Sequence, residues 1–190
     1  MSQIKLSSPL SEKAVRSLKI GDEVIISGTI FTGRDAVHKA LSEGAKFPPG
    51  LKDGIIFHCG PIITGRRGNW SVIACGPTTS ARAEPYQADV IKRLGIRAII
   101  GKGGMGKNTL DACRSHGAVY LHAIGGAAQI YARNVKKVIN CYMEEFGMPE
   151  AMWELFVEDF YTVVTMDSNG NSLHDEVEKA SLACLNKSLI

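Results

Sequence analysis

A repeated pattern of apolar strand, glycine loop and helix start constrains this chain more than any other feature of its sequence. Residues 70–82 read WSVIACGPTTSAR, and residues 97–106 read RAIIGKGGMG. Each segment is an apolar, β-branched run that ends at glycine and continues into small, hydroxyl or cationic residues before a helical pattern. We therefore expect two strands whose carboxyl ends lie side by side and share one pocket.

The loops after these two strands carry donors suited to an anion. Helix N-termini expose unpaired backbone N–H groups and a partial positive charge. Thr78, Thr79 and Arg82 follow the first strand, and Lys102 follows the second. These residue types predict an anion-binding pocket at this edge of the sheet.

A third element has the same construction. Residues 23–31 have the β-branched pattern of a strand, and Thr32-Gly33-Arg34-Asp35 comes directly after it. We expect Asp35 to be the N-cap of a helix from residue 36 to about residue 42 that stops at Gly44. Arg34 would then lie at the helix start, beside the other cations.

The alternation of strands and helices predicts an α/β fold with a parallel or mixed sheet covered by helices. In such sheets ligands bind beyond the carboxyl ends of the strands, where the glycine loops lie. Residues 65–69 read as a hairpin turn, residues 150–160 give a mixed pattern, and Val135-Lys136-Lys137-Val138 reads as a solvated helix edge. Further strands are expected over residues 55–58, 62–64, 118–122 and 162–166, and helices over residues 12–18, 85–94, 107–115, 127–146 and 174–186.

The second glycine loop also resembles two nucleotide-binding motifs. Residues 101–106 match G-x-G-x-x-G, and residues 101–107 begin a P-loop. The P-loop needs Ser or Thr after its lysine, where Asn108 stands, and the dinucleotide motif needs an acid about twenty residues on, where residues 120–122 read YLH. Only the general anion-binding property of the loop remains.

Composition favours one globular domain over residues 1–190, with 45% hydrophobic and 22% charged residues. A net charge of +3 without blocks of like charge predicts no nucleic-acid or membrane arm. No apolar run approaches the roughly eighteen residues of a membrane span, and the N-terminal pattern is not that of a signal peptide. We expect a cytoplasmic protein.

The five cysteines show neither metal-site nor disulfide spacing, because no CxxC pair occurs among them. We expect most to be buried, reduced thiols. Cys59 and Cys75 each precede a glycine at a strand end, so they are the two that could line a site, although packing is the simpler interpretation. The five are Cys59, Cys75, Cys113, Cys141 and Cys184.

Four segments match the motifs of a known enzyme family in order and spacing. Together they resemble the beta subunit, or C-terminal domain, of iron–sulfur class I fumarate hydratases and the related L-tartrate dehydratases. The likeness covers nearly the whole chain. The segments are residues 27–36 (SGTIFTGRDA), 76–82 (GPTTSAR), 99–106 (IIGKGGMG) and 148–173, which begins MPEA and ends GNSL.

The resemblance implies a swivelling β/β/α domain, with a mixed sheet and flanking helices, that closes over a [4Fe–4S] cluster. The resemblance further implies that three cysteines of a partner alpha subunit hold that cluster, and we expect this chain to bind no cofactor alone. Thr78 looks like the family's proton-transfer threonine, Lys102 like its active-site lysine, and Arg34 and Arg82 like its carboxylate clamps. The backbone and side chains expected to contact substrate also include Thr79, Gly101 and Gly103.

The resemblance also implies the substrate and the assembly. Residues 120–128, YLHAIGGAA, look more like the fumarase version of this segment than the tartrate version. We therefore expect a fumarate hydratase subunit that acts on fumarate and malate, with an L(+)-tartrate dehydratase subunit or a non-catalytic dicarboxylate-binding subunit as alternatives. The chain is expected to pair with the alpha subunit and to self-associate, as a homodimer, when isolated.

Overall fold

The structure is a computed structural model that describes residues 3–188. The strands are β1 (Ile4–Ser7), β2 (Glu23–Thr32), β3 (Ile55–Phe57), β4 (Ile62–Arg66), β5 (Asn69–Ala74), β6 (Ala98–Gly101), β7 (Val119–His122), β8 (Val135–Tyr142) and β9 (Met152–Met166). The helices are α1 (Glu12–Arg16), α2 (Asp35–Glu43), α3 (Glu84–Leu94), α4 (Lys107–His116), α5 (Ala128–Asn134) and α6 (Leu173–Ser188).

A seven-stranded mixed sheet in the order β1-β2-β3-β6-β7-β9-β8 forms the body of the molecule. Strands β1, β2, β3, β6 and β7 run parallel, whereas β9 is antiparallel to both of its neighbours β7 and β8. Because β9 also pairs with β2, strands β2, β3, β6, β7 and β9 close into a barrel. The predicted mixed sheet with flanking helices is confirmed.

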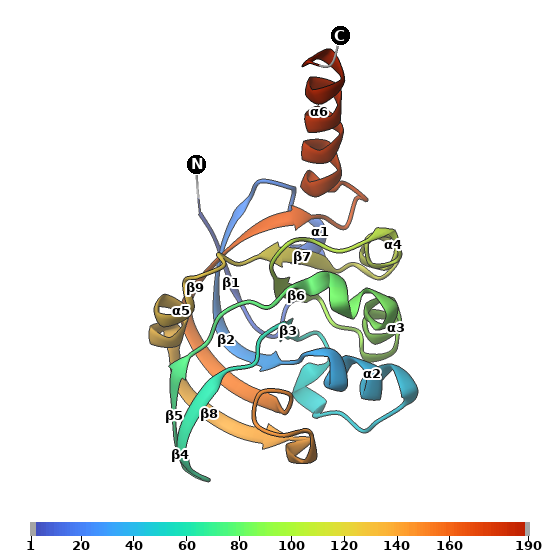
Figure 1. The fold of residues 1–190 in the computed structure, drawn as a ribbon. Coiled ribbons are helices and arrows are strands. Elements are labelled where there is room, and N and C mark those ends of the chain that lie inside the picture. Colours follow the sequence, from blue (N-terminus) through green and yellow to red (C-terminus); the bar gives the residue numbers. More distant parts are fainter. Residues whose placement is uncertain (1–2, 189–190) are drawn as a thin grey trace.

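Side chains along the parallel strands alternate between the barrel interior and the helices. Ile55 and Phe57 belong to the core cluster inside the barrel, and Ile56 between them packs in the second cluster, under the helices. Helices α2, α3 and α4 cover that outer face, while α5 and the β4–β5 hairpin lie on the other side of the sheet (Figure 1). The strands are apolar on both faces because both faces are covered.

Three of the helices end where the sequence predicts. Gly44, Gly95 and Gly117 are the C-caps of α2, α3 and α4, and each has a positive φ between 66° and 108°. Glycine adopts this left-handed conformation without the steric cost that a Cβ brings. These stops return the chain to the sheet, so that the next strand can begin.

The prediction of one helix over residues 127–146 is wrong. The helix α5 ends at Asn134, and Val135-Lys136-Lys137-Val138 begins β8 rather than lying on a helix edge. β8 is an edge strand that pairs only with β9, and its register slips between Val135 and Lys137 and again between Val138 and Asn140. These irregularities hide the alternation by which a strand is recognised.

Two other strand predictions are corrected. The mixed region and the short strand at residues 162–166 form a single strand, β9, which contains Asp159 at a φ of 52°. The strand that begins near Trp70 is β5, which pairs with β4 in a separate two-stranded hairpin rather than joining the main sheet. The short strand β1 was not expected from the sequence.

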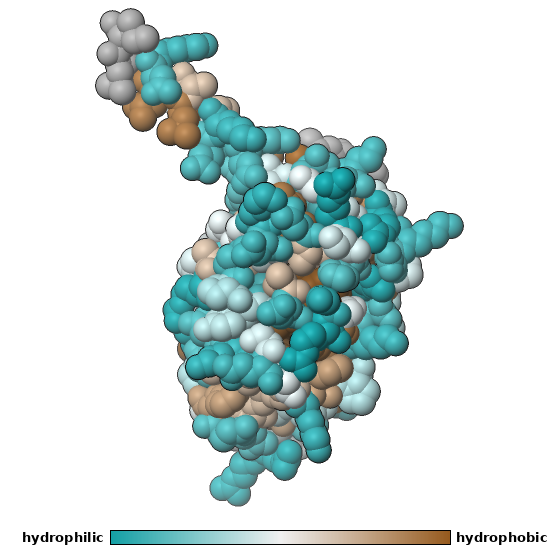
Figure 2. Space-filling model, turned by 90° about the vertical axis from the view of Figure 1, so that its right-hand side faces the viewer, coloured by the Kyte–Doolittle hydropathy of each residue, from teal (hydrophilic) through white to brown (hydrophobic). Residues whose placement is uncertain are grey.

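The predicted closing helix is present and extends away from the body. All side chains from Asp175 to Lys187 of α6 are exposed, including the apolar Val177, Leu182 and Leu185. Figure 2 shows this projection beside the largely hydrophilic face of the body. Within residues 3–188, no helix is both long and apolar enough to cross a membrane.

Candidate functional site

The carboxyl ends of the parallel strands meet at one edge of the sheet, as the sequence predicts. Arg34 follows β2, His58 follows β3, and Lys102 follows β6. The loop after β5 reaches the same edge, although β5 lies outside the main sheet, because Thr79 and Lys102 form a parallel β-bridge. The two glycine loops therefore lie side by side.

Thr78 is held by the backbone at the end of β3. Its N–H donates to the carbonyl oxygen of His58 at 2.7 Å, and its Oγ1 hydroxyl donates to the same oxygen at 3.0 Å. The side chain is partly buried. Its hydroxyl proton therefore points at a carbonyl, which cannot accept a proton in catalysis, and transfer to another group requires this hydrogen bond to break.

Lys102 and Gly101 have different structural constraints. Lys102 is partly buried and extends beside Gly125, where a Cβ would lie 3.5 Å from its Cδ and 4.0 Å from its Nζ. Gly101 has no room for a side chain, since a Cβ there would collide with the Ser80 hydroxyl. Gly103 is exposed and has a φ of 82°, which favours glycine.

Arg34 forms an ion pair within the chain. Its Nη1 lies 2.9 Å from Oε1 of Glu150, and the two side chains are only 23% and 26% exposed. The other oxygen of Glu150 accepts from the N–H of Ala36 at 3.3 Å, in the first turn of α2. Gly60 leaves room for the arginine, because a Cβ there would lie 2.9 Å from Arg34 Cδ.

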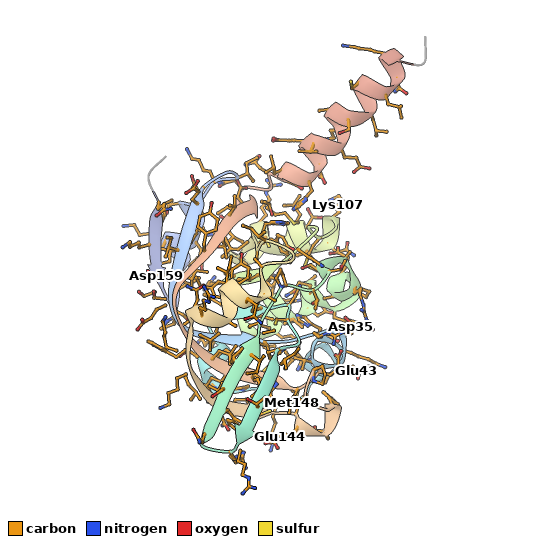
Figure 3. The ribbon with its side chains drawn as sticks, turned by 60° about the vertical axis from the view of Figure 1, so that its left-hand side comes forward. Asp35, Glu43, Lys107, Glu144, Met148 and Asp159 are labelled. Carbon is orange, nitrogen blue, oxygen red and sulfur yellow. The ribbon has the colours of Figure 1, made fainter. Side chains whose placement is uncertain are left out.

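Arg82 also forms an ion pair within the chain. Its partner is Asp35, which was expected from the sequence to be the N-cap of the helix. Asp35, labelled in Figure 3, is the first residue of α2 rather than its N-cap, which is Arg34. Its carboxylate forms an ion pair with the Arg82 guanidinium. Arg82 is 59% exposed. The ion pair therefore holds Arg82 near the N-terminus of α2, where Arg34 is the N-cap.

The N-termini of two helices do bind carboxylates, but these carboxylates belong to side chains of the same chain. Oε2 of Glu84 accepts from the N–H of Gly106 at 2.8 Å and from the Thr109 hydroxyl at 2.6 Å, at the start of α4. Glu150 lies in the same way at the start of α2. Carboxylates of the chain therefore already accept from backbone N–H groups at the starts of both helices.

A group of buried polar side chains that was not expected from the sequence lies behind this edge. His58 bonds Ser80 at 2.8 Å, Gln87 at 3.0 Å and His38 at 3.1 Å. Burial lowers the pKa of both histidines, so the neutral imidazole is favoured. The one sequence signal is the position of His58 directly after a buried strand.

Cys59 and Cys75 are buried with their sulfur atoms 3.6 Å apart, and burial raises the pKa of the Cys59 thiol. The packing interpretation of this pair is confirmed. Among the described residues, no group of three or more His, Cys, Asp or Glu side chains is placed to hold a metal ion.

Comparison with known proteins identifies the family. The sequence profile described as "Fumarase C-terminus" matches residues 1–177. The chain belongs to the fumarase C-terminus family. A protein of Geobacillus stearothermophilus, provisionally named a fumarate hydratase class I, is 55% identical over 185 residues, which make up 97% of this chain and 36% of that protein. The chain thus spans about a third of the length of that relative.

Relatives named as subunits have nearly the same length as this member of the family. A protein of Methanocaldococcus jannaschii, provisionally named L(+)-tartrate dehydratase subunit beta, is 44% identical over 184 residues and 94% of each chain. The L(+)-tartrate dehydratase subunit beta of Escherichia coli is 33% identical over 176 residues, 92% of this chain and 88% of its own. The resemblance inferred from the four motifs is confirmed.

Proposed function

We propose that this chain is the beta subunit of a hydro-lyase that adds water to fumarate, with L-malate as product. The observation that carries the proposal is the meeting of Thr78, Lys102 and Arg34 at one sheet edge, in a chain of the fumarase C-terminus family. The higher identity to the relative named for fumarate, 55% against 44% and 33%, supports fumarate over tartrate as the substrate.

In this proposal the arginines bind substrate carboxylates after leaving their internal partners. A guanidinium presents paired N–H donors that match a carboxylate, so a substrate could replace Glu150 on Arg34 and Asp35 on Arg82 with the same geometry. The exposed Arg82 pair costs little to open, because ion pairs in water contribute at most about 1 kcal/mol. Arg34 is more deeply placed and would fix the substrate's orientation.

Lys102 and Thr78 would act on the reacting part of the substrate. Hydration passes through a carbanion-like species whose charge spreads into the neighbouring carboxylate, and a fixed ammonium group stabilises that charge more than the ground state. Thr78 would transfer the proton at the carbon beside that carboxylate. In hydration the hydroxyl would give its proton to that carbon, and the nearby positive charge would stabilise the alkoxide left behind. A partner that carries a proton would then restore the hydroxyl, since the carbonyl of His58 has no proton to give.

A [4Fe–4S] cluster belongs to this proposal as part of the alpha subunit, not of this chain. When bound there, it supplies a Lewis-acidic iron to the substrate. The role of this chain would be to close over the substrate with its cationic edge. The isolated chain is therefore expected to have no turnover and to remain colourless after anaerobic treatment with iron and sulfide.

Co-expression with an alpha subunit tests the proposal. We expect the two chains to elute together in size-exclusion chromatography and to hydrate fumarate. Lys102→Ala should lower kcat/KM by about tenfold to a thousandfold, the scale of one lost electrostatic donor. Lys107→Ala is the matched control, because Lys107, the first residue of α4 directly after the same loop, is 82% exposed and pairs with Asp111.

Three outcomes would contradict the proposal. Turnover of L-tartrate but not of fumarate would assign the chain to the dehydratase alternative. A cluster-loaded complex that binds dicarboxylates without turning over either substrate would favour the non-catalytic alternative. Independent elution of the two chains at micromolar concentration would show that they do not form a complex, so the alpha subunit would not be the partner.

A further inference from the structure

A chain of five buried polar side chains lies directly behind the candidate site, and the proposed mechanism does not use it. Each of the five is at most 2% exposed. They come from four different parts of the fold, so no local secondary structure explains their contact. They are His38 in α2, His58 after β3, Ser80 and Gln87 before and within α3, and Tyr120 in β7.

The hydrogen-bond partners fix the direction of every donor. The carbonyl of Arg34 lies 2.9 Å from His38 Nδ1 and can only accept, so Nδ1 carries the hydrogen and Nε2 of a neutral His38 has a lone pair. His58 Nε2, 3.1 Å away, must then donate. His58 Nδ1 accepts from Ser80 at 2.8 Å, and Ser80 in turn accepts from Tyr120 at 2.8 Å.

The opposite tautomer of His58 does not fit. With the hydrogen on Nδ1, the Nε2 lone pair of His58 would face the Nε2 lone pair of His38 at 3.1 Å. The amide oxygen of Gln87, 3.0 Å from the same nitrogen, would also face a lone pair. The observed arrangement leaves only Gln87 Nε2 without a partner among these five buried side chains.

The backbone links this chain of side chains to the candidate site at three points. His38 holds the carbonyl of Arg34. The carbonyl of His58 holds both the N–H and the hydroxyl of Thr78. The N–H of Ser80 donates to the carbonyl of Lys102 at 3.0 Å.

We propose that His58 is a positioning residue. As a neutral imidazole with its hydrogen on Nε2, it holds Arg34, Thr78 and Lys102 at fixed positions relative to one another. The inference rests on the proposed function for the roles of those three residues. A rigid ring with an acceptor on one side and a donor on the other links two loops in a way that no aliphatic side chain can. A shift of about 1 Å between catalytic groups can cost about a hundredfold in rate.

Two variants each preserve half of the contacts of His58. His58→Asn places a polar atom near the former Nδ1, within reach of Ser80, and His58→Gln reaches toward His38 and Gln87 instead. Thr162→Val is the control, because Thr162 is fully buried and donates to Val24 at 3.1 Å, at the opposite end of β2 from the site.

The first measurement uses the isolated chain and needs no turnover. In a ¹⁵N-histidine spectrum at pH 7, we expect His58, identified by its loss in His58→Asn, to carry hydrogen on Nε2 only. The amide of Thr78 should exchange about tenfold faster in both His58 variants, as expected for roughly one weakened hydrogen bond. It should keep its wild-type rate in Thr162→Val. A hydrogen on Nδ1, or unchanged exchange at Thr78, overturns the proposal.

The second measurement uses the complex with the alpha subunit. We expect both His58 variants to lower kcat by about tenfold to a hundredfold, whereas Thr162→Val changes kcat by less than about twofold even where its stability loss is as large. Equal losses in the control and the His58 variants would mean a structural role only. If the variants of His58 do not fold, Ser80→Ala, which removes the next link, is measured in their place. If the wild-type complex has no turnover, the proposed function fails, and the exchange experiment still decides the role of His58.

Discussion

Replacement of Gly101 by alanine tests the packing behind the candidate site. A Cβ at this position would collide with the Ser80 hydroxyl and would lie 3.0 Å from Tyr120 Oη and 3.1 Å from His58 Nδ1. Ser80 is buried and bonded on both sides, so it cannot turn away without breaking the hydrogen bonds to His58 and Tyr120. The substitution therefore disturbs the whole chain of buried side chains.

The expected loss in the free energy of unfolding of Gly101→Ala combines two effects. Overfilling a packed interior costs about 1 to 3 kcal/mol, and each displaced hydrogen bond adds about 1 kcal/mol. We expect Gly101→Ala to lower the free energy of unfolding by about 3 kcal/mol. With an m value of about 2 kcal/mol/M, that loss shifts the urea midpoint down by about 1.5 M.

Gly125→Ala serves as the matched substitution in the neighbouring loop. A Cβ there would meet only the flexible side chain of Lys102, at ordinary contact distances of 3.5 Å from Cδ and 4.0 Å from Nζ. We expect its midpoint to stay within about 0.3 M of wild type, since exposed substitutions rarely change stability by more than about 0.5 kcal/mol. A midpoint for Gly101→Ala inside the same interval would refute the packing argument.

Three further predictions concern stability and turnover. Glu84→Ala should lower the free energy of unfolding by about 2 kcal/mol, because α4 loses the carboxylate at its start, and Glu84→Gln by about half of that in the same urea titrations. The pKa of His38 and of His58 is lowered by burial, so the unfolded chain binds protons first as the pH falls. Stability should then drop below about pH 6.5, by up to about 1.4 kcal/mol per pH unit for each histidine, and a flat profile between pH 6.5 and 5.5 would contradict this. In steady-state assays of the complex, Thr78→Ala should lower kcat far more than it raises KM, whereas Arg82→Ala should change both; near-normal kcat for Thr78→Ala would move the proton-transfer role to the partner.

The repeated strand and glycine pattern was sufficient to predict that the two glycine loops lie side by side at one edge of the sheet. Only the loop at Gly101 follows a strand of the parallel sheet, whose carboxyl ends share one side. The loop at Gly76 follows β5 of the separate hairpin and reaches the same edge through the bridge between Thr79 and Lys102. The partners of the charged groups could not be predicted in this way. Arg34 and Glu150 are separated by 116 positions, and nothing in the spacing of charges indicates which pairs a closed sheet brings together.

The errors at β8 and β9 have a common cause. Both strands are irregular where they pair, with register slips along β8 and the left-handed Asp159 inside β9. Local propensity gives little information at such positions, because the pairing with neighbouring strands decides the structure there rather than the strand's own pattern. The hydrogen-bond chain through His58 was missed for a related reason, since its members lie up to 82 residues apart, from His38 to Tyr120.

The position of β9 in the sequence determines when the barrel can close during synthesis. β9 is the last strand of the chain, yet it covers edges of both β2 and β7. While a ribosome is still adding residues 152–166, those two edges have unpaired N–H and C=O groups that can join a neighbouring nascent chain. Newly made chains therefore depend on protection during this interval, and a gene truncated before Met152 should yield aggregates rather than a smaller folded protein.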